Sequence, residues 1–437
     1  MGSSPLANES QREENMEERT AQLNTQCQCI SVDETKLNTE VHRLIHDLGL
    51  ADQVAEKVGA MLSKNGVFIS ATSTDQMKQL VKALFTVCAM PKFQETVLHY
   101  APTIARHQQR TSGVFYGFDF HLGENGPQLI EINTNAGGAM ICALEIGASK
   151  NCCVPTIENL AQRNVPYEIY EKFIDMFTKE WRSFKNDQNA ILKTIAIVDE
   201  SPAEQFLYPE FLLFKALFKS KGIHAIIAGP DELKIIDGKV SIEDTTIDLI
   251  YNRTTDFYFE SPSCKTLREV YLQDLAAITP NPFQHAVFAN KQNLCILSND
   301  EQLMGLGVDA QTRSILLEHI PKTVEVSPQN EDALWENRKQ YFFKPTQGFG
   351  SRAVYRGDKM TKSVWSEIKG NSYVAQQVIP PSRRTVVVDG VDVDLKVDIR
   401  DYAFEGISLL CATRTYQGQT TNLRTLGGGF SPVYEVK

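Results

Sequence analysis

Residues 116–133 constrain the fold most, because they predict a β-hairpin with one apolar face and one acidic face. Two short strands flank a turn-rich centre, Gly-Glu-Asn-Gly-Pro at 123–127. We expect the hairpin to be symmetric about Asn125, so that side chains alternate between its two faces. The apolar face then consists of two opposed pairs, Phe118 with Ile132 and Phe120 with Ile130.

The other face of this hairpin places Asp119 opposite Glu131, and Asn133 follows two residues later. Directly opposed carboxylates have Cβ atoms about 5 Å apart and repel each other unless a positive charge lies between them. A hard divalent cation such as Mg²⁺ accepts carboxylate and amide oxygens as ligands. The pattern therefore suggests a metal site, and the alternative is an exposed acidic patch on a solvated hairpin.

Length and composition indicate an ordinary globular protein with two or three domains. The chain has 437 residues with 42% hydrophobic and 22% charged residues, which leaves enough apolar surface for a large core. The net charge of −10 argues against nucleic acid or an anionic membrane as a general partner. No run of about 18 apolar residues appears, so we expect no membrane span. The polar N-terminus favours a cytoplasmic location.

The nine cysteines are typical of reduced, buried thiols. Several fall in apolar segments. The pairs Cys27/Cys29 and Cys152/Cys153 lack a second matching pair, so the sequence does not predict a zinc site.

Four regions follow from the pattern along the chain. Residues 1–35 are rich in Glu, Gln, Asn and Ser and are expected to be disordered or loosely helical, and dispensable for folding. Residues 36–185 combine helical periodicity at 38–63, 75–108 and 166–185 with the hairpin.

Residues 190–285 predict a small parallel α/β domain, because strands and helices alternate. Thr194–Val198 reads as a buried strand. Ser201, Pro202 and Glu204 then supply the N-cap, first-turn proline and capping-box glutamate of a helix. Arg253 falls just past the carboxyl end of a predicted strand, where open α/β sheets bind their ligands.

Residues 286–437 predict a mixed α and β region with a lysine-bearing strand, 341–344, before a glycine-rich loop, 346–351. Such a loop can bind phosphates through backbone N–H groups, but the same pattern also fits a surface turn. The apolar segment 373–379 suits either an adenine edge or a plain core strand. Near the end of the chain, Lys396, Asp398 and Arg400 share a strand face. Two further arginines, an asparagine and a glycine run then follow within residues 414–429, which favours an anion-binding surface.

Together these segments resemble the ATP-grasp superfamily of carboxylate–amine ligases, including glutathione synthetases and ribosomal-protein glutamate ligases. The resemblance covers residues 70–437. It implies an ATP-grasp fold beside the small α/β domain, with ATP and Mg²⁺ as cofactors. The implied magnesium ligands are Asp119, Glu131 and Asn133. The implied nucleotide-binding residues are Lys291, Lys344, Gly348, Gly350, Ser351, Gln376, Gln377, Ile379 and Asn422. The implied catalytic residues are Arg400, Arg414 and Arg424, and the substrate residues are Arg253 and Gly428.

The order of the motifs differs from the usual one. The E-x-N hairpin ordinarily closes an ATP-grasp domain, whereas here it precedes the other motifs. Joining residue 437 to about residue 65 would restore the usual cyclic order, so the chain resembles a circularly permuted ATP-grasp protein. Two positions depart from the family pattern: Gln376 stands where many relatives have an acidic residue, and Thr-Asn-Ala-Gly-Gly follows Asn133.

The resemblance implies an ATP-dependent ligase that forms ADP and joins small-molecule carboxylate and amine substrates through an acyl phosphate. Loop 346–351 is expected to close over the site. An ATP-grasp kinase acting on a hydroxyl, a non-catalytic ATP-binding protein, and an α/β protein unrelated to nucleotides are the alternatives. The sequence does not indicate the two substrates or the oligomeric state.

Overall fold

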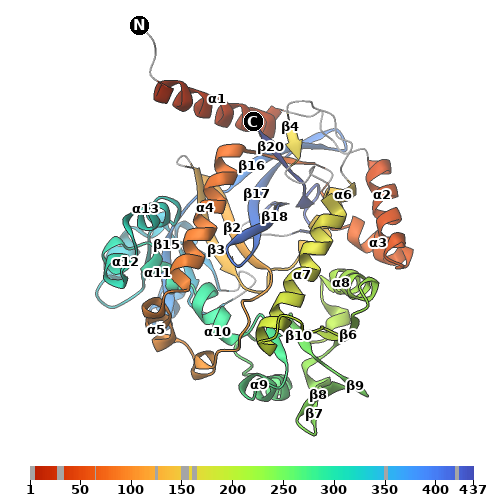
Figure 1. The fold of residues 1–437 in the computed structure, drawn as a ribbon. Helices are drawn as coiled ribbons and strands as arrows, with labels where there is room; N and C mark the ends of the chain where they lie inside the picture. The colour runs from red at the N-terminus through yellow and green to blue at the C-terminus, as the bar shows by residue number, and fades with distance from the viewer. Residues whose placement is uncertain are drawn as a thin grey trace.

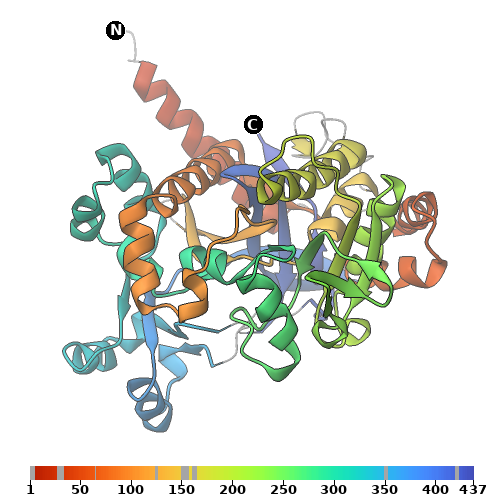
Figure 2. The same cartoon turned by 60° about the horizontal axis from the view of Figure 1, so that its bottom comes forward.

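The computed structural model describes residues 5–26, 34–63, 65–123, 126–148, 157–159, 165–348, 353–418 and 423–437. Its architecture is mixed α/β, with helices around a central antiparallel sheet and two smaller sheet-containing units at its flanks (Figures 1 and 2). No described helix is both long and apolar enough to cross a membrane.

The central sheet brings together segments from opposite ends of the chain. Its strand order is β19-β18-β17-β2-β3, with β16 also paired to β17 (Figure 1). The strands are β2 (Tyr116–Gly123), β3 (Gly126–Asn133), β16 (Ser382–Val388), β17 (Val391–Phe404), β18 (Ile407–Tyr416) and β19 (Gly429–Ser431). The hairpin β2–β3 therefore lies beside β17, with β2 antiparallel to it.

The predicted hairpin forms, but its register is only partly that of a symmetric hairpin. Asp119 lies opposite Glu131 and Phe118 opposite Ile132, as expected. Phe120 lies opposite Leu129, so the predicted pairing with Ile130 is wrong. Ile130 is an extra residue in a β-bulge, and a bulge leaves one residue outside the ladder.

The two faces of the central sheet differ as the alternation predicted. Phe118, Phe120 and Ile132 belong to a core that includes apolar residues of α4 (Ala71–Cys88), which covers this face. On the opposite face, Tyr402 and Ala412 pack into the core formed with α6 (Ala139–Ala148) and α7 (Val165–Lys185). Next to these, the charged side chains of the candidate site lie on the same face.

The C-terminal strand lies against the segment that leads into α4. β1 (Val67–Ser70) pairs in parallel with β20 (Val433–Val436), and β4 (Ile157–Asn159) pairs with β20 on its other side. The end of the chain therefore lies near the start of α4, as the permuted order predicted.

The N-terminal region, expected to be disordered or loosely helical, contains a helix that packs on the rest of the protein. Helix α1 spans Pro5–Gln26, and its C-terminal part packs on β1 and β16. The Asn24 side chain makes two hydrogen bonds with the backbone of Phe68. Its Nδ2 donates to the carbonyl at 2.8 Å, and its Oδ1 accepts from the N–H group at 3.0 Å. Buried Arg384 donates to the carbonyls of Leu23 and Asn24 at the end of the helix. Met16 and Leu23 of this helix also pack against Phe68 and Tyr434. Two apolar side chains in a polar helix are too few to give a clear periodic signal.

The α/β domain contains a parallel sheet of order β11-β10-β5-β6. These strands are β5 (Thr194–Val198), β6 (His224–Ala228), β10 (Leu249–Asn252) and β11 (Ala277–Thr279). A separate three-stranded sheet consists of β7 (Lys234–Ile236), β8 (Lys239–Ile242) and β9 (Thr245–Thr246). The predicted helix start at Ser201 is wrong. Ser201 has φ 42° and makes no cap bond, Pro202–Glu204 form a 3-10 turn, and helix α8 begins later, spanning Tyr208–Ser220. The predicted helix near 263–276 is shorter, with α9 spanning Lys265–Leu272.

A separate four-stranded sheet, called the β13 sheet below, carries the predicted lysine strand. Its order is β12-β15-β13-β14, formed by Thr323–Glu325, Tyr373–Gln377, Tyr341–Pro345 and Tyr355–Arg356. One face of this sheet buries Phe343, Ala375 and Tyr373 in a small core with Trp365 of α15 (Lys362–Lys369) and Leu334 of α14 (Glu331–Glu336). The opposite face carries Lys344 and Gln376.

The remaining helices connect these units. The predicted helical segments at 38–63 and 75–108 are each divided: Gly49, with φ 71°, separates α2 from α3, and Pro91 begins α5. Their bounds are α2 (Glu34–Asp47), α3 (Asp52–Gly59), α5 (Pro91–Tyr100), α10 (Pro282–Gln284), α11 (Asn293–Leu297), α12 (Asp300–Leu306) and α13 (Ala310–His319). Free thiols occur at Cys88, Cys142, Cys264, Cys295 and Cys411. Cys27, Cys29, Cys152 and Cys153 lie outside the described residues.

Candidate active site

The candidate site consists of charged side chains that the register of the central sheet aligns in two adjacent rows. In one row Glu131 lies opposite Asp119, and Asp119 opposite Arg400. In the next row Asp398 lies opposite Arg414. Because β2, β3, β17 and β18 present these residues on one face, groups that are about 280 residues apart in sequence become neighbours.

Asp119 binds two arginines. Its Oδ1 accepts from Arg400 Nε at 2.6 Å, and its Oδ2 accepts from Arg400 Nη2 at 2.7 Å. Arg414 Nη2 lies 2.9 Å from the same Oδ2, and Asn133 Nδ2 donates to it at 3.2 Å. Although burial opposes the charged form, Asp119 raises the pKa of Arg400. Both Asp119 oxygens are therefore used in fixing guanidinium groups.

Asp398 forms a second network that the sequence analysis did not identify. His121 Nε2 lies 2.9 Å from Asp398 Oδ1, and His121 Nδ1 lies 2.8 Å from the Ile379 carbonyl. Tyr416 donates to Asp398 at 2.9 Å, and Arg414 reaches its other oxygen at 3.4 Å. His121 follows Asp119 by two residues, so strand alternation could have placed it on this face.

Glu131 is paired with a lysine from outside the central sheet. Lys291 Nζ lies 2.9 Å from Glu131 Oε1 and also donates to the Gly348 carbonyl at 2.8 Å. Burial raises the pKa of Glu131, but Lys291 and Lys344 outweigh it and lower the value to about 2. The positive charge that the opposed carboxylates require is therefore supplied by protein side chains in this structure.

Lys344 links the β13 sheet to the bulge in the β2–β3 hairpin. Its Nζ donates to the carbonyl of Ile130 at 3.0 Å and to Gln376 Oε1 at 2.6 Å. Burial lowers the pKa of Lys344 to about 8, with Lys291 adding to this effect and Glu131 opposing it. The bulge is what exposes the Ile130 carbonyl, so the irregular pairing at that point has a direct role in placing this lysine.

The other predicted nucleotide residues divide into three groups. Gly348 contacts Lys291 as described. Gln377 is exposed at the end of β15, and the Ile379 carbonyl accepts from His121. Gly350, Ser351 and Asn422 lie outside the described residues.

The predicted substrate residue Arg253 is buried, and its guanidinium group contacts other protein groups. Its Nη1 donates to the Asn135 carbonyl at 3.0 Å and to Tyr251 Oη at 3.1 Å, and its Nη2 lies 3.8 Å from Glu210. Glu210 in turn accepts from the backbone N–H groups of Gly138 and Met140 at the start of α6. The pair therefore fastens the segment after the hairpin to the α/β domain.

The two remaining predicted residues, Arg424 and Gly428, have other contacts. Arg424 is exposed, with its guanidinium 5.2 Å from the Phe206 ring centroid. A Cβ on Gly428 would lie 2.5 Å from the Thr415 carbonyl, and one on Gly429 would lie 2.6 Å from the Met61 carbonyl. Close backbone packing thus requires glycine at both positions, independently of a ligand.

The residues partly fit a magnesium ion. Glu131 and Asn133 offer the oxygen atoms that Mg²⁺ prefers, on one face of the hairpin. Asp119 does not fit, because its oxygens are bonded to Arg400 and Arg414. Among the described residues, no group of three or more His, Cys, Asp or Glu could hold a metal by itself. Any metal here would need further oxygens from a ligand.

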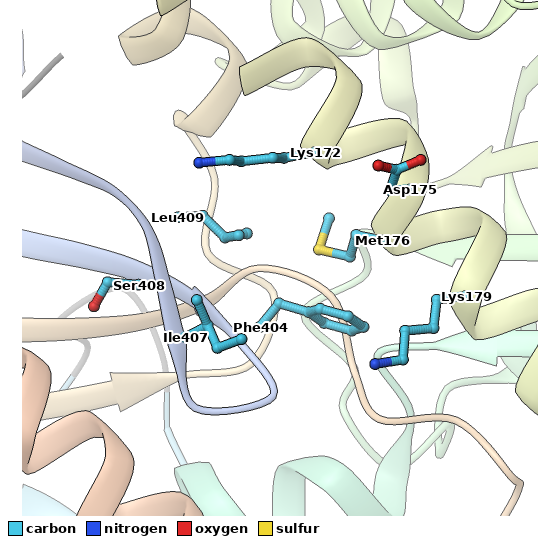
Figure 3. Close-up of a pocket in the computed structure, with 8 residues that line it drawn as sticks. All are labelled: Lys172, Asp175, Met176, Lys179, Phe404, Ile407, Ser408 and Leu409. Carbon is cyan, nitrogen blue, oxygen red and sulfur yellow. The ribbon is translucent and has the colours of Figure 1, made fainter. Parts of the chain in front are cut away.

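A separate cavity of about 250 Å³ lies between α7 and the β17–β18 hairpin (Figure 3). Met176 and Phe404 lie between the lysines of its wall in this view. Its lining is Lys172, Asp175, Met176, Lys179, Phe404, Ile407, Ser408 and Leu409, which includes none of the predicted site residues.

Comparisons with known proteins identify the fold. No protein-family model and no curated protein matches the sequence. A glutathione synthetase-like effector from Globodera pallida, in its apo form, is similar in structure with a TM-score of 0.57 and 10% identity, over 88% of this chain and 96% of that one. A putative gamma-glutamylcysteine synthetase from Methylobacillus flagellatus has a TM-score of 0.46 and 9% identity, covering 83% and 88% of the two chains. The ATP-grasp ligase PsnB, complexed with minimal precursor, has a TM-score of 0.29 and 11% identity, covering 55% and 89%. The chain therefore shares its overall fold with the glutathione synthetase-like effector.

Proposed function

We propose that this protein is an ATP- and Mg²⁺-dependent ligase that joins a small-molecule carboxylate to an amine and forms ADP. One observation carries the proposal. Four largely buried cations from three parts of the chain converge on the β2–β3 hairpin: Lys291, Lys344, Arg400 and Arg414. Within an ATP-grasp-type fold, this concentration of positive charge suits the phosphates of a nucleotide and a phosphoryl group in transfer.

The lysines and arginines have distinct parts in this proposal. Lys291 and Lys344 bind phosphate oxygens, and Lys291 exchanges Glu131 for phosphate when the nucleotide enters. Arg400 and Arg414, held side by side by Asp119, face the oxygens of the transferring group and of the acyl phosphate. ATP supplies the phosphoryl group that activates the carboxylate, after which the amine attacks the acyl carbon and phosphate leaves.

Glu131 and Asn133 are the residues that would hold Mg²⁺, together with phosphate oxygens. Magnesium would neutralise charge on the phosphates. Asp119 is then a positioning residue for Arg400 and Arg414. Glu131 becomes available to the metal only when Lys291 turns to phosphate, so we expect metal and nucleotide to bind with positive coupling.

We propose that Arg253 does not bind the substrate directly but positions the segment Asn135–Gly138, which lies next to Arg400. Its contacts with the Asn135 carbonyl and Glu210 hold this segment. Tyr402 donates to the Gly137 carbonyl at 2.7 Å from the central sheet. This segment is thus held by Arg253 of the α/β domain and by Tyr402 of the central sheet.

We also infer that the chain is a circular permutant of the usual ATP-grasp order. The pairings of β2 with β17 and of β1 with β20 support this inference, since both join the ends of the present chain within one structural unit.

Incubation with Mg-ATP, pooled amino acids and pooled amines tests the proposal, with phosphate release and product masses followed together. A ligase yields ADP, phosphate and a condensed product in equal amounts. A phosphorylated product without phosphate release would instead indicate the kinase alternative, and nucleotide binding without turnover would indicate a non-catalytic protein. Arg400→Lys is the matched test of the site, since it keeps the charge but loses the two-point contact with Asp119.

A further inference from the structure

The pocket between α7 and the end of the β17–β18 hairpin has an apolar interior (Figure 3). Glu405 and Gly406 form the turn of this hairpin, with φ values of 49° and 78°. A two-residue turn with positive φ at both positions keeps the flanking strands paired, so Phe404 lies directly opposite Ile407 and on the same side of the hairpin. Met176 of α7 lines the same pocket. Side chains from two elements that are far apart in the sequence therefore form one apolar surface.

The size of this pocket suits a small apolar group. Its volume is about 250 Å³, which is below the range of about 300–1,000 Å³ that holds drug-sized ligands. A nucleotide is therefore too large, whereas one aromatic ring or a branched alkyl group fits. Ile407 is 67% exposed and extends the apolar surface out of the pocket, so a ligand that covers it removes further apolar area from water.

Two of the polar side chains that line the pocket already have protein partners. Lys179 forms an ion pair with Glu405, and its Nζ lies 5.7 Å from the Phe404 ring centroid. Ser408 donates from its hydroxyl to the Asp401 carboxylate at 2.5 Å. Both groups are engaged within the protein, so a ligand gains little from either of them.

The other two polar side chains at the pocket, Lys172 and Asp175, have no such partners. Neither side chain forms a hydrogen bond or an ion pair with another residue in the described ranges. They are three residues apart on α7, so both lie on the helix face that borders the pocket. In Figure 3, Lys172 extends from the helix towards the hairpin. The rim therefore presents one unpaired cation and one unpaired anion beside an apolar interior.

We propose that this pocket binds a free α-amino acid with a large apolar side chain. The carboxylate of the ligand pairs with Lys172 and its ammonium group with Asp175, while its side chain enters the space lined by Met176 and Phe404. An apolar carboxylate would be attracted by Lys172 but repelled by Asp175, and an apolar amine would meet the reverse. A zwitterion satisfies both charges. No residue of the candidate active site lines this pocket, so the site is additional to the proposed ligase function and its occupation needs no nucleotide.

Titration of the ligand-free protein with L-phenylalanine tests the proposal, followed by NMR of isotope-labelled methionine methyl groups. The Met176 signal reports on the pocket and is assigned with Met176→Leu. Met77, which is buried in the core beside α4, serves as the internal control and should not shift. Phenylpropanoate lacks the ammonium group, and phenethylamine lacks the carboxylate. Because the two charged side chains are exposed, L-phenylalanine is expected to bind about threefold more tightly than either analogue.

Two variants separate the contributions of the two charges. Lys172→Gln should remove the preference for L-phenylalanine over phenethylamine and retain the preference over phenylpropanoate, and Asp175→Asn should do the opposite. Lys215→Gln, an exposed change on α8, is the matched control and should retain both preferences. A Met176 signal that L-phenylalanine does not shift would overturn the proposal, and so would preferences that persist in both variants. Neither result bears on the ligase proposal, because no nucleotide is present.

Discussion

Glu131→Gln should destabilise the ligand-free protein, because Lys291 and Lys344 would lose the carboxylate that faces them. Considered from the hairpin alone, the same change would relieve the repulsion between Asp119 and Glu131 and would not lower the melting temperature. The lysines reverse that expectation. Burial raises the pKa of Glu131, but the two lysines outweigh it and lower the value from 4.5 to about 2. Such a shift corresponds to about 3 kcal/mol of stability at neutral pH.

The side chain of Glu131 is 31% exposed, so solvent screens part of this interaction and we expect about 1–2 kcal/mol. The stabilisation from a carboxylate whose pKa is lowered in the folded state is complete above the pKa of the unfolded state. It is lost as the pH falls through the pKa of the folded state. The difference between variant and wild type should therefore be largest above about pH 5 and should shrink towards about pH 2.

Urea unfolding of both proteins at pH 7 and at mildly acidic pH measures this difference. Glu95→Gln, an exposed change on α5, is the control for removal of one negative charge. In the double variant with Lys291→Gln, the loss should be less than the sum of the single losses. Equal stability of wild type and Glu131→Gln at pH 7 would refute the ion-pair reasoning.

Three further predictions concern other parts of the site and fold. Asp119→Asn should lower the free energy of unfolding by about 3 kcal/mol, because buried Arg400 loses its counter-ion and Arg414 keeps only Asp398; an unchanged urea midpoint would contradict this. The affinity for Mg-ATP should fall as pH rises through about 8, since Lys344 then loses its proton; in Lys344→Arg this dependence should disappear, and a profile identical to wild type would exclude Lys344 as its source. Removal of residues 1–26 should lower the melting temperature, because Arg384 and the Phe68 backbone lose their partners in α1, and an unaltered melting curve would show that the helix is dispensable.

The sequence predicted the hairpin and its opposed carboxylates because strict alternation determines which side chains share a face. It predicted Thr194–Val198 to the residue, since an apolar run bounded by polar residues has few other structures available. It also predicted that Asp398 and Arg400 share a face, although the direct pairing of Arg400 with Asp119 depends on strand order, which local pattern does not contain.

Other features could not be predicted from the local sequence pattern. A bulge at Ile130 adds one residue without changing composition, and its carbonyl acquires a role only through Lys344, more than 200 positions away. The capping signal at Ser201 was overridden by a 3-10 turn. Helix α1 is held by polar contacts of Asn24 and Arg384 and by only two packed apolar side chains, Met16 and Leu23, so hydrophobic periodicity did not predict it.

The source of the oxygen in released phosphate tests the central claim most directly. Turnover is run with Mg-ATP, pooled amines and carboxylate substrates labelled with a heavy oxygen isotope, and the phosphate is analysed by mass spectrometry. An acyl phosphate requires that one carboxylate oxygen leaves with the phosphate, so the account predicts one heavy oxygen in each phosphate released. Phosphate that carries no label, formed together with ADP, would contradict activation of a carboxylate at this site.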